Sequence, residues 1–212
     1  MKELQKKLLL LVRNEISFYD FSLKLSNQSY VKPFHGGKVT YHLTFINHEV
    51  DFDVTADVAI RFDALEDIVN EDNRFLTNKE KSLTYSFGVE MGNLVYGSQK
   101  RWTVYDESDV INVTKEIMNM FIIYAIPYFE KYCNIQNAFL LLADNKNTSW
   151  MHCPIHGERA KRALALSILL DNKERIPELV NESTKLLTQL NDFGLQDYLK
   201  FSRKLVTMGD RP

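Results

Sequence analysis

Apolar and polar residues alternate between positions 38 and 62, and this is the clearest structural signal in the chain. Every second residue is apolar in VTYHLTF and in VDFDVTADVAIRF, and a short polar turn, Asn47 to Glu49, separates the two runs. A period of two places successive side chains on opposite faces of a strand, so these runs predict a β-hairpin with one buried face. A shift by one residue would bury the aspartates, so we expect a firm register.

A second pattern, with helical spacing, follows over residues 101–132. The short strand RWTVY leads into a helix that should begin near Asp106, whose carboxylate can accept bonds from the free amides of the first turn. Apolar residues then recur three or four positions apart. From Ile117 onward the other faces are apolar too, Ile122 among them, and such a helix is usually buried. We therefore expect residues 106–132 to form the core helix.

The remaining segments predict helices around a small sheet. Residues 2–16 form an amphipathic pattern, residues 83–89 a third strand, and residues 94–105 a fourth strand interrupted by Gly97. Pro127 takes away one helical hydrogen bond, so we expect a bend or an end of the core helix near it.

The predicted fold class is α+β. It comprises an antiparallel β-meander of four or more strands over about residues 38–105, packed by helices, and a helical C-terminal part over about residues 135–206. At 212 residues, with 45% hydrophobic and 25% charged positions, the chain suits a single domain over residues 1–212.

Charge and hydropathy narrow the choice of partners. The formal net charge of -2 gives no general attraction to nucleic acid or to an anionic membrane. The basic run Arg159, Lys161 and Arg162 is more typical of a solvated helix face than of a nucleic-acid site. The longest apolar run, residues 118–127, is too short to span a bilayer. We therefore expect neither a nucleic-acid nor a membrane partner, and another protein is the remaining class.

Cysteine usage and the first residues favour the cytoplasm. Two cysteines, Cys133 and Cys153, are no disulfide framework for a chain of this length, which indicates a reducing compartment. The leucine run near the start is closely bracketed by charges and no small-residue cleavage site follows it, so we expect no signal peptide.

The segment WMHCPIH carries the sharpest candidate chemistry. Cys153 and His156 have the C-x-x-H spacing of metal ligands, but a structural zinc site needs four ligands. They could also form a nucleophilic pair, since a neighbouring imidazolium lowers the pKa of a thiol. The alternative is a loop that leads into a helix with His156 near its start, and the sequence leaves open whether this segment binds metal. The residues that could complete a zinc site are Cys133, His35, His42 and His48.

Three aspartates offer a second candidate, a carboxylate metal site on the sheet. Asp51, Asp53 and Asp57 fall on one face of the predicted strand, and residues two apart lie roughly 6.6 Å apart along a strand. Two such carboxylates can reach toward one hard cation. Charges on the polar face of a strand are more often solvated, so we expect no tight metal site there and no resident cofactor.

The order of these segments resembles a bacterial family of proteins, domain of unknown function four-three-zero-four. The resemblance lies in a leading helix, the hairpin VTYHLTF and VDFDVTADVAIRF, the tryptophan strand RWTVYD, a long helix ending in YAIPYFEKY, and a helical pair from ERAKRALALSILL onward. It covers about residues 1–190. It implies an α+β fold, and it implies no established activity and no catalytic residues.

Two hypotheses for function follow. The first is a non-enzymatic binding or interaction module of a bacterial cytoplasm, for example of the immunity-protein kind. The second is a small enzyme that uses Cys153 and His156, or a metal held by carboxylates of the sheet.

Overall fold

The computed structural model describes residues 1–145 and 147–209, without the side chains of residues 147, 148, 208 and 209. The chain divides into two compact units. Unit 1 comprises Met1–Ile60 and Gly88–Lys131, and unit 2 comprises Arg61–Phe87 and Tyr132–Pro212. Within the described residues, no helix combines the length and the apolar character that crossing a bilayer requires.

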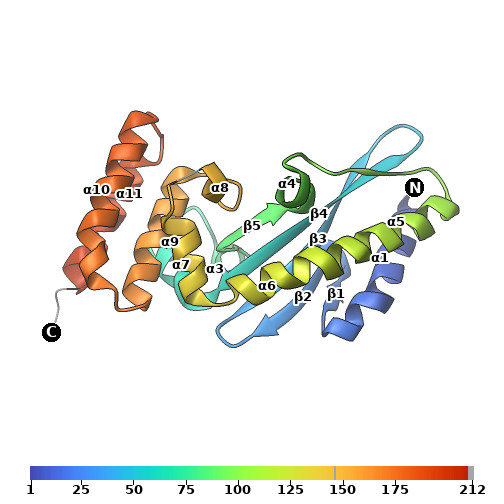
Figure 1. Cartoon of the computed structure of the whole chain (residues 1–212), viewed down its shortest axis with the longest axis horizontal. Coiled ribbons are helices and arrows are strands. Elements are labelled where there is room, and N and C mark those ends of the chain that lie inside the picture. The colour runs from blue at the N-terminus through green and yellow to red at the C-terminus, as the bar shows by residue number, and fades with distance from the viewer. Residues whose placement is uncertain (146, 210–212) are drawn as a thin grey trace. The chain divides into compact units, whose positions relative to one another are not determined.

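Unit 1 contains an antiparallel sheet whose one face is covered by helices (Figure 1). β4, β5 and α6 each extend into unit 2 by one or two residues. The elements are, in chain order, α1 (Lys2–Ile16), η1 (Ser17–Tyr19), β1 (Ser22–Lys24), η2 (Leu25–Asn27), β2 (Ser29–Phe34), β3 (Gly37–Asn47), β4 (Phe52–Phe62), β5 (Phe87–Glu90), α4 (Met91–Tyr96), β6 (Trp102–Val104), α5 (Glu107–Met120), η3 (Phe121–Ala125) and α6 (Ile126–Tyr132).

The predicted α+β class with an antiparallel sheet is confirmed. The described strands follow the order β1-β2-β3-β4-β5, with β6 also paired to β4. The predicted hairpin is β3 and β4, and its turn closes with a bond from the His48 amide to the Asp51 carbonyl at 3.0 Å. Two strands were not predicted: β1 and β2 precede the hairpin and extend the sheet, with Tyr30 opposite Tyr41.

The edge strand beyond β4 is split in two. β6 pairs with the first part of β4, where Trp102 lies opposite Val54. β5 also pairs with β4, and Gly88 approaches the β4 backbone at Val58. Between β5 and β6 the chain leaves the sheet and forms α4, so the predicted strand over residues 94–96 was wrong.

Local chemistry explains why a helix forms there. The Glu90 carboxylate accepts hydrogen bonds from the amides of Gly92, at 2.9 Å, and Asn93, at 2.8 Å, and so caps the first turn of α4. Gly92 has no side chain, and a Cβ there would collide with the backbone nitrogen of Lys100. Gly97 ends the helix in the left-handed conformation, which glycine adopts without strain.

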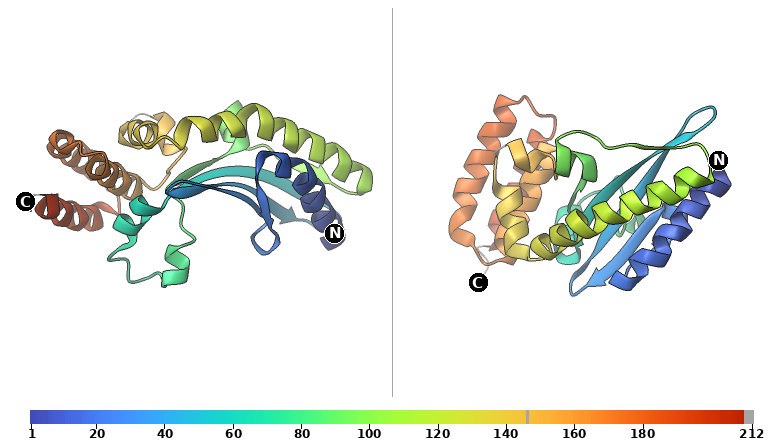
Figure 2. Two further views of the ribbon diagram at one scale, coloured as in Figure 1. Left: turned by 90° about the horizontal axis from the view of Figure 1, so that it is seen from below. Right: turned by 45° about the vertical axis from the view of Figure 1, so that its right-hand side comes forward.

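Helices α1 and α5 cover one face of the sheet (Figure 2). Hydrogen bonds connect them to the strands. The buried Tyr30 hydroxyl donates to the Leu9 carbonyl of α1 at 2.8 Å. The Tyr41 hydroxyl donates to a carbonyl of α5 at 3.3 Å, and the Trp102 indole donates to Glu116 at 2.7 Å. Each bond joins one strand to one helix, so it fixes the position of that helix along the sheet.

The long helix that we predicted as the core helix comprises α5, η3 and α6. Asp106 caps it as expected, since its carboxylate accepts bonds from the Ser108 and Asp109 amides at 2.8 and 3.1 Å. We expected a bend or an end of the helix near Pro127, and the structure has a π-helical turn, η3, just before it, in which the Ile126 amide bonds to the Phe121 carbonyl five residues back. The chain then continues as α6 instead of ending.

Phe121, the first residue of the π-helical turn, is the centre of an aromatic cluster. Its ring lies 5.5 Å from the ring of Tyr19, 5.3 Å from Phe21 and 5.1 Å from Tyr41, each in an edge-to-face arrangement. Two segments distant in sequence from the core helix, residues 19–21 and β3, therefore meet at one of its side chains. The residue after it, Ile122, is 44% exposed, so the prediction that this face is buried was wrong.

Unit 2 is mainly helical, and α9 is its central element, in contact with α2, α7, α10 and α11 (Figure 1). All but four of the α9 residues are buried. The helices of unit 2 are α2 (Asp63–Asn70), α3 (Asn78–Lys81), α7 (Ile135–Ala143), α8 (Asn147–Trp150), α9 (His156–Leu169), η4 (Lys173–Arg175), α10 (Ile176–Gln189) and α11 (Leu195–Gly209).

We predict that Phe121→Ala lowers the free energy of unfolding of unit 1 by about 3–5 kcal/mol, because it removes the centre of the aromatic cluster and leaves a cavity. The adjacent Ile122→Ala should cost less than about 1 kcal/mol, since Ile122 is largely exposed. Urea denaturation followed by tryptophan fluorescence measures both. Equal losses for the two variants would contradict the placement of Phe121 and Ile122 on opposite sides of the turn.

Candidate functional site

Cys153 does not have the surroundings of an activated nucleophile. Its thiol is free and buried, and this burial raises its pKa more than the nearby Arg162 and Arg159 lower it. The thiol therefore stays protonated at neutral pH, and only the thiolate is a strong nucleophile.

His156 is the first residue of α9. Among the described residues, no hydrogen bond joins its side chain to that of Cys153. Its Nδ1 is buried and has no hydrogen-bond partner there. In the same part of the chain, no group of three or more His, Cys, Asp or Glu side chains is arranged to hold a metal ion. The structure thus places both candidates in one loop-to-helix segment but assembles neither a zinc site nor a catalytic pair from them.

Three basic side chains of α9 are buried, although we expected a solvated helix face. Arg159 is 3%, Lys161 8% and Arg162 7% exposed. The prediction was wrong because each side chain has a polar partner within unit 2. Lys161 contacts both Glu158 and Asp197, and the other two cations are held by a carboxylate or a carbonyl.

The strongest of these contacts joins Arg162 to Glu66 of α2. The Arg162 guanidinium donates from Nε to Glu66 Oε1 at 3.0 Å and from Nη2 to Oε2 at 3.2 Å, and from Nη1 to Glu158 at 2.9 Å. Glu66 Oε2 also accepts bonds from Asn70 and Thr84, at 3.1 and 2.8 Å. This network connects α2 to α9. Each of its charged side chains has an opposite charge beside it, so none of them is left as an unpaired group that could act in catalysis.

The three aspartates of the predicted metal site do not converge. Asp51 lies in the turn before β4, and its Oδ1 is buried without a hydrogen-bond partner in the described chain. Asp53 accepts a bond from the Thr103 hydroxyl at 2.7 Å, and His48 Nε2 lies 3.2 Å from its other oxygen. Asp57 lies four residues further along β4, roughly 13 Å away. One cation cannot be shared by Asp53 and Asp57 at this separation.

The environments of Asp53 and Asp57 shift their pKa values in opposite directions. The bond from Thr103, followed by that of His48, holds the pKa of Asp53 below its usual value. Burial, with the Glu90 carboxylate nearby, raises the pKa of Asp57 to about 6, and a bond with Thr44 only partly offsets this. The surroundings of Asp53 therefore stabilise its ionised form, whereas those of Asp57 destabilise its ionised form.

An exposed apolar surface lies on the π-helical turn of unit 1. Ile122 is 44%, Ile123 49% and Tyr124 38% exposed, and Pro127 of α6 is exposed as well. We call these four residues the η3 patch. Phe121 and Ala125, at the two ends of the same turn, are fully buried, so the turn is anchored on one side and presents apolar side chains on the other.

Two elements that contact the π-helical turn carry further exposed aromatic side chains. The exposed Phe18 of η1 is adjacent to Tyr19, whose ring contacts Phe121 at 5.5 Å. The exposed Tyr96 comes from α4, which packs against η3. Isolated apolar side chains are common on protein surfaces, but a contiguous group of them usually marks a binding surface.

The η3 patch was missed because helical periodicity alone assigns apolar residues to the interior. One feature of the sequence could have indicated the exposed surface. The run FIIYAIPYF has more apolar residues than one buried stripe of a helix can accommodate, and it contains a proline. π-helical turns are frequent at functional sites, and here the turn coincides with the exposed surface.

No protein-family model matches the chain, and no curated protein and no solved structure matches it either. The resemblance to domain of unknown function four-three-zero-four therefore stays a prediction.

We predict that Asp57→Asn and Asp53→Asn change the pH dependence of stability with opposite signs. The folded pKa of Asp57 is raised, so its favourable contribution is present below pH 4 and lost as the pH rises to about 6, by about 1–2 kcal/mol after allowance for partial exposure. The folded pKa of Asp53 is lowered, so its contribution is present above pH 4 and lost as the pH falls below it. Urea midpoints of the wild type and each variant across this range measure both effects, and parallel curves would refute the assignment.

We predict that Glu66→Gln destabilises unit 2 by about 3 kcal/mol, because it leaves the buried Arg162 cation without its principal counter-charge. The matched control is Glu71→Gln at the exposed pair with Lys204, where solvent screens the charges and the unfolding midpoint should hardly move. Thermal unfolding at low and high salt is the measurement. A loss for Glu66→Gln no greater than that of the control would show that the pair is not needed for folding.

Proposed function

We propose that the chain is a non-enzymatic protein-binding module and that the η3 patch is its binding surface. The single observation that supports this most is the exposure of three apolar residues on one π-helical turn, with Pro127 just after it, although the turn is otherwise fixed in the core of unit 1. Exposed apolar surface is unfavourable in water, and covering it with a partner removes this cost.

The surroundings of the patch have the composition of a protein interface. The same helix carries the exposed Lys115 and Asn119 before the patch and Glu130 after it. An apolar centre with a polar rim is the usual anatomy of such interfaces, and aromatic residues such as Tyr124, Tyr96 and Phe18 are enriched in them. We therefore propose a folded protein partner that presents a complementary apolar surface.

Such a module can take the form of an immunity protein, which is a bacterial cytoplasmic protein that binds and neutralises another protein. The proposed compartment rests on the cysteine usage of the chain, since two cysteines in 212 residues suit a reducing environment. The enzyme hypothesis receives less support, since burial keeps the Cys153 thiol protonated and Asp53 and Asp57 lie far apart.

A photo-crosslinking amino acid at position 123, within the patch, tests the proposal in the cell of origin. The same amino acid at Asn112, exposed on the preceding part of the helix, serves as the control. We expect a defined adduct with one other protein from position 123 and none from position 112. The adduct partner is then purified and its affinity measured by calorimetry.

The quantitative test compares Ile123→Lys with Phe193→Lys, which places the same charge on an exposed apolar position of unit 2. We expect Ile123→Lys to weaken binding at least about tenfold and Phe193→Lys to leave it unchanged. Both variants should retain the circular dichroism spectrum of the wild type. Equal affinities, no adduct from position 123, or an adduct only with a second copy of this chain would each overturn the proposal.

A further inference from the structure

One carboxylate, that of Glu90, holds both ends of the segment that leaves the sheet of unit 1. Its Oε1 accepts hydrogen bonds from the Gly92 amide at 2.9 Å and the Lys100 amide at 3.3 Å, and its Oε2 accepts one from the Asn93 amide at 2.8 Å. Gly92 and Asn93 lie in the first turn of α4, and Lys100 lies beyond its end. A helix of six residues is too short to be stable alone, so the conformation of this segment depends on Glu90.

A second carboxylate, that of Asp57, lies beside Glu90. β5 is the neighbour of β4 in the antiparallel sheet, and a Cβ on Gly88 would lie 3.1 Å from the Cβ of Ala59. Gly88 is therefore opposite Ala59. Two residues further along β5 and two residues back along β4, Glu90 is opposite Asp57. Side chains in such a cross-strand pair have Cβ atoms roughly 5 Å apart, so the two carboxylates are close neighbours on one face of the sheet.

Other titratable side chains surround Asp57, but none of them offsets its charge. His42 of β3 is on the same face, two residues from the Thr44 that bonds to Asp57, and burial lowers its pKa, so the imidazole is neutral at pH 7. Tyr41 points to the opposite face, where its hydroxyl donates to α5, and burial raises its pKa, so it stays neutral as well. Asp53, on the same face of β4, is itself an anion.

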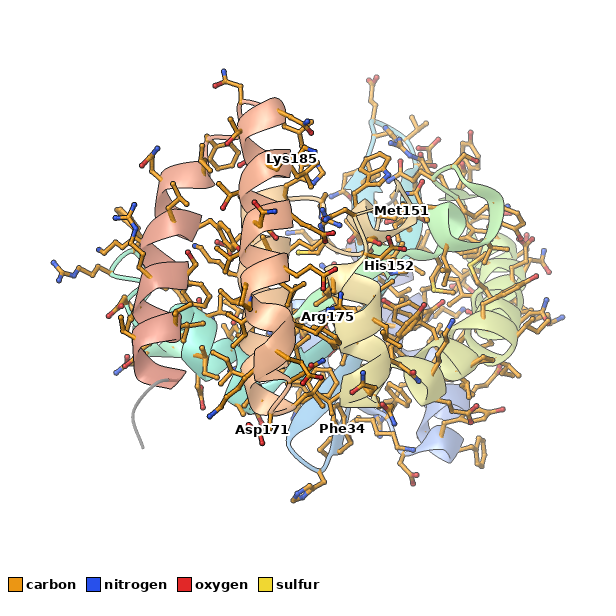
Figure 3. All side chains as sticks on the ribbon, turned by 60° about the vertical axis from the view of Figure 1, so that its left-hand side comes forward. Phe34, Met151, His152, Asp171, Arg175 and Lys185 are labelled. Carbon is orange, nitrogen blue, oxygen red and sulfur yellow. The ribbon has the colours of Figure 1, made fainter. Side chains whose placement is uncertain are left out.

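The nearest cation is directed elsewhere. The Lys100 amide bonds to Glu90, but the Lys100 ammonium lies 3.8 Å from Glu116 of α5. No ion pair within the part of the chain that the structure describes includes Asp57 or Glu90. By contrast, Arg175 at the start of α10 has a carboxylate 2.6 Å from its Nε (Figure 3). The pair of carboxylates on the sheet therefore has no counter-charge among the described residues.

A proton on Asp57 removes the repulsion between the two groups. Burial, with the Glu90 carboxylate nearby, raises the pKa of Asp57 to about 6, so Asp57 is mainly protonated at pH 5 and mainly ionised at pH 7. Once both groups are ionised, the repulsion displaces the less firmly held one. Asp57 belongs to β4, which has strands on both sides, whereas Glu90 is the last residue of an edge strand and holds α4 by hydrogen bonds alone.

We propose that α4 is a pH-sensitive element, which is closed while Asp57 carries a proton and opens more often once Asp57 has released that proton to solvent. Opening moves the Glu90 carboxylate away from Asp57 and so relieves the repulsion, which is why loss of the proton shifts the equilibrium toward the open form. α4 also packs against η3, so its opening changes the surroundings of the η3 patch. The switch itself requires no partner at that patch.

Amide hydrogen exchange of the isotope-labelled full chain between about pH 5 and pH 7.5 tests the proposal. The amides of Gly92, Asn93 and Gly97 report on α4, because their hydrogen bonds exist only while it is closed. After correction for the intrinsic effect of pH on exchange, we expect their protection to fall about fivefold over this range. The internal reference is the Ser108 amide, which is capped in the same way by Asp106. The pKa of Asp106 is lowered by that bonding, so the protection of Ser108 should not change.

Two variants separate the roles of the two carboxylates. Asp57→Asn removes the group that titrates, and Glu90→Gln removes the charge that repels it but keeps an oxygen for the cap. In both variants, we expect the protection of α4 to be independent of pH over this range. In Glu90→Gln, the carboxyl carbon of Asp57 should also titrate at a lower pH than in the wild type. The matched control is Asp53→Asn, on the same face of β4, which should keep the full pH dependence of the wild type.

The proposal is overturned by any of three results: protection of α4 that does not change with pH in the wild type, the same pH dependence in Asp57→Asn as in the wild type, or loss of that dependence in Asp53→Asn. If Asp57→Asn fails to fold, Glu90→Gln with Asp53→Asn as its control decides the question.

Discussion

The packing of Phe121 against Tyr19, Phe21 and Tyr41 is the interaction on which the architecture of unit 1 depends. It fixes the rotation of the long helix over the sheet, because a side chain at the centre of an aromatic cluster can occupy only one position. Phe121 points inward, and the three residues that follow it, Ile122 to Tyr124, are exposed. The π-helical turn, which holds one residue more than an α-helical turn, lies just before Ile126 and Pro127, and the exposed apolar surface results from the same constraint.

Unit 2 depends on buried charges as well as on apolar packing. α9 is surrounded by helices on several sides, yet its first half carries three cations. Burial of an uncompensated cation is too unfavourable for a stable fold, so each partner must be in place before α9 can be covered. Glu66 lies 96 residues away in sequence from Arg162, so α2 and α9 have to come together for unit 2 to fold.

Features encoded by neighbouring residues could be predicted from the sequence, and features that depend on distant residues could not. Strand alternation predicted the β3–β4 hairpin, and Asp106 predicted the start of α5. α4 was mistaken for a strand because its three last residues, Leu94 to Tyr96, are apolar, whereas its cap at Glu90 and the close approach of Lys100 to Gly92 determine its conformation. The burial of Arg162 and the exposure of Ile122 both depend on long-range partners, and periodicity contains no information about these.

The split edge strand has a consequence for how the protein behaves at high concentration. β4 is eleven residues long, and an unbroken strand of similar length beside it would offer a long row of free amides and carbonyls to another molecule. α4 instead divides this edge into β5, of four residues, and β6, of three, and β1 at the opposite edge also has three residues. Short edge strands are poor templates for adding a foreign strand, so the insertion of α4 protects the sheet against edge-to-edge aggregation.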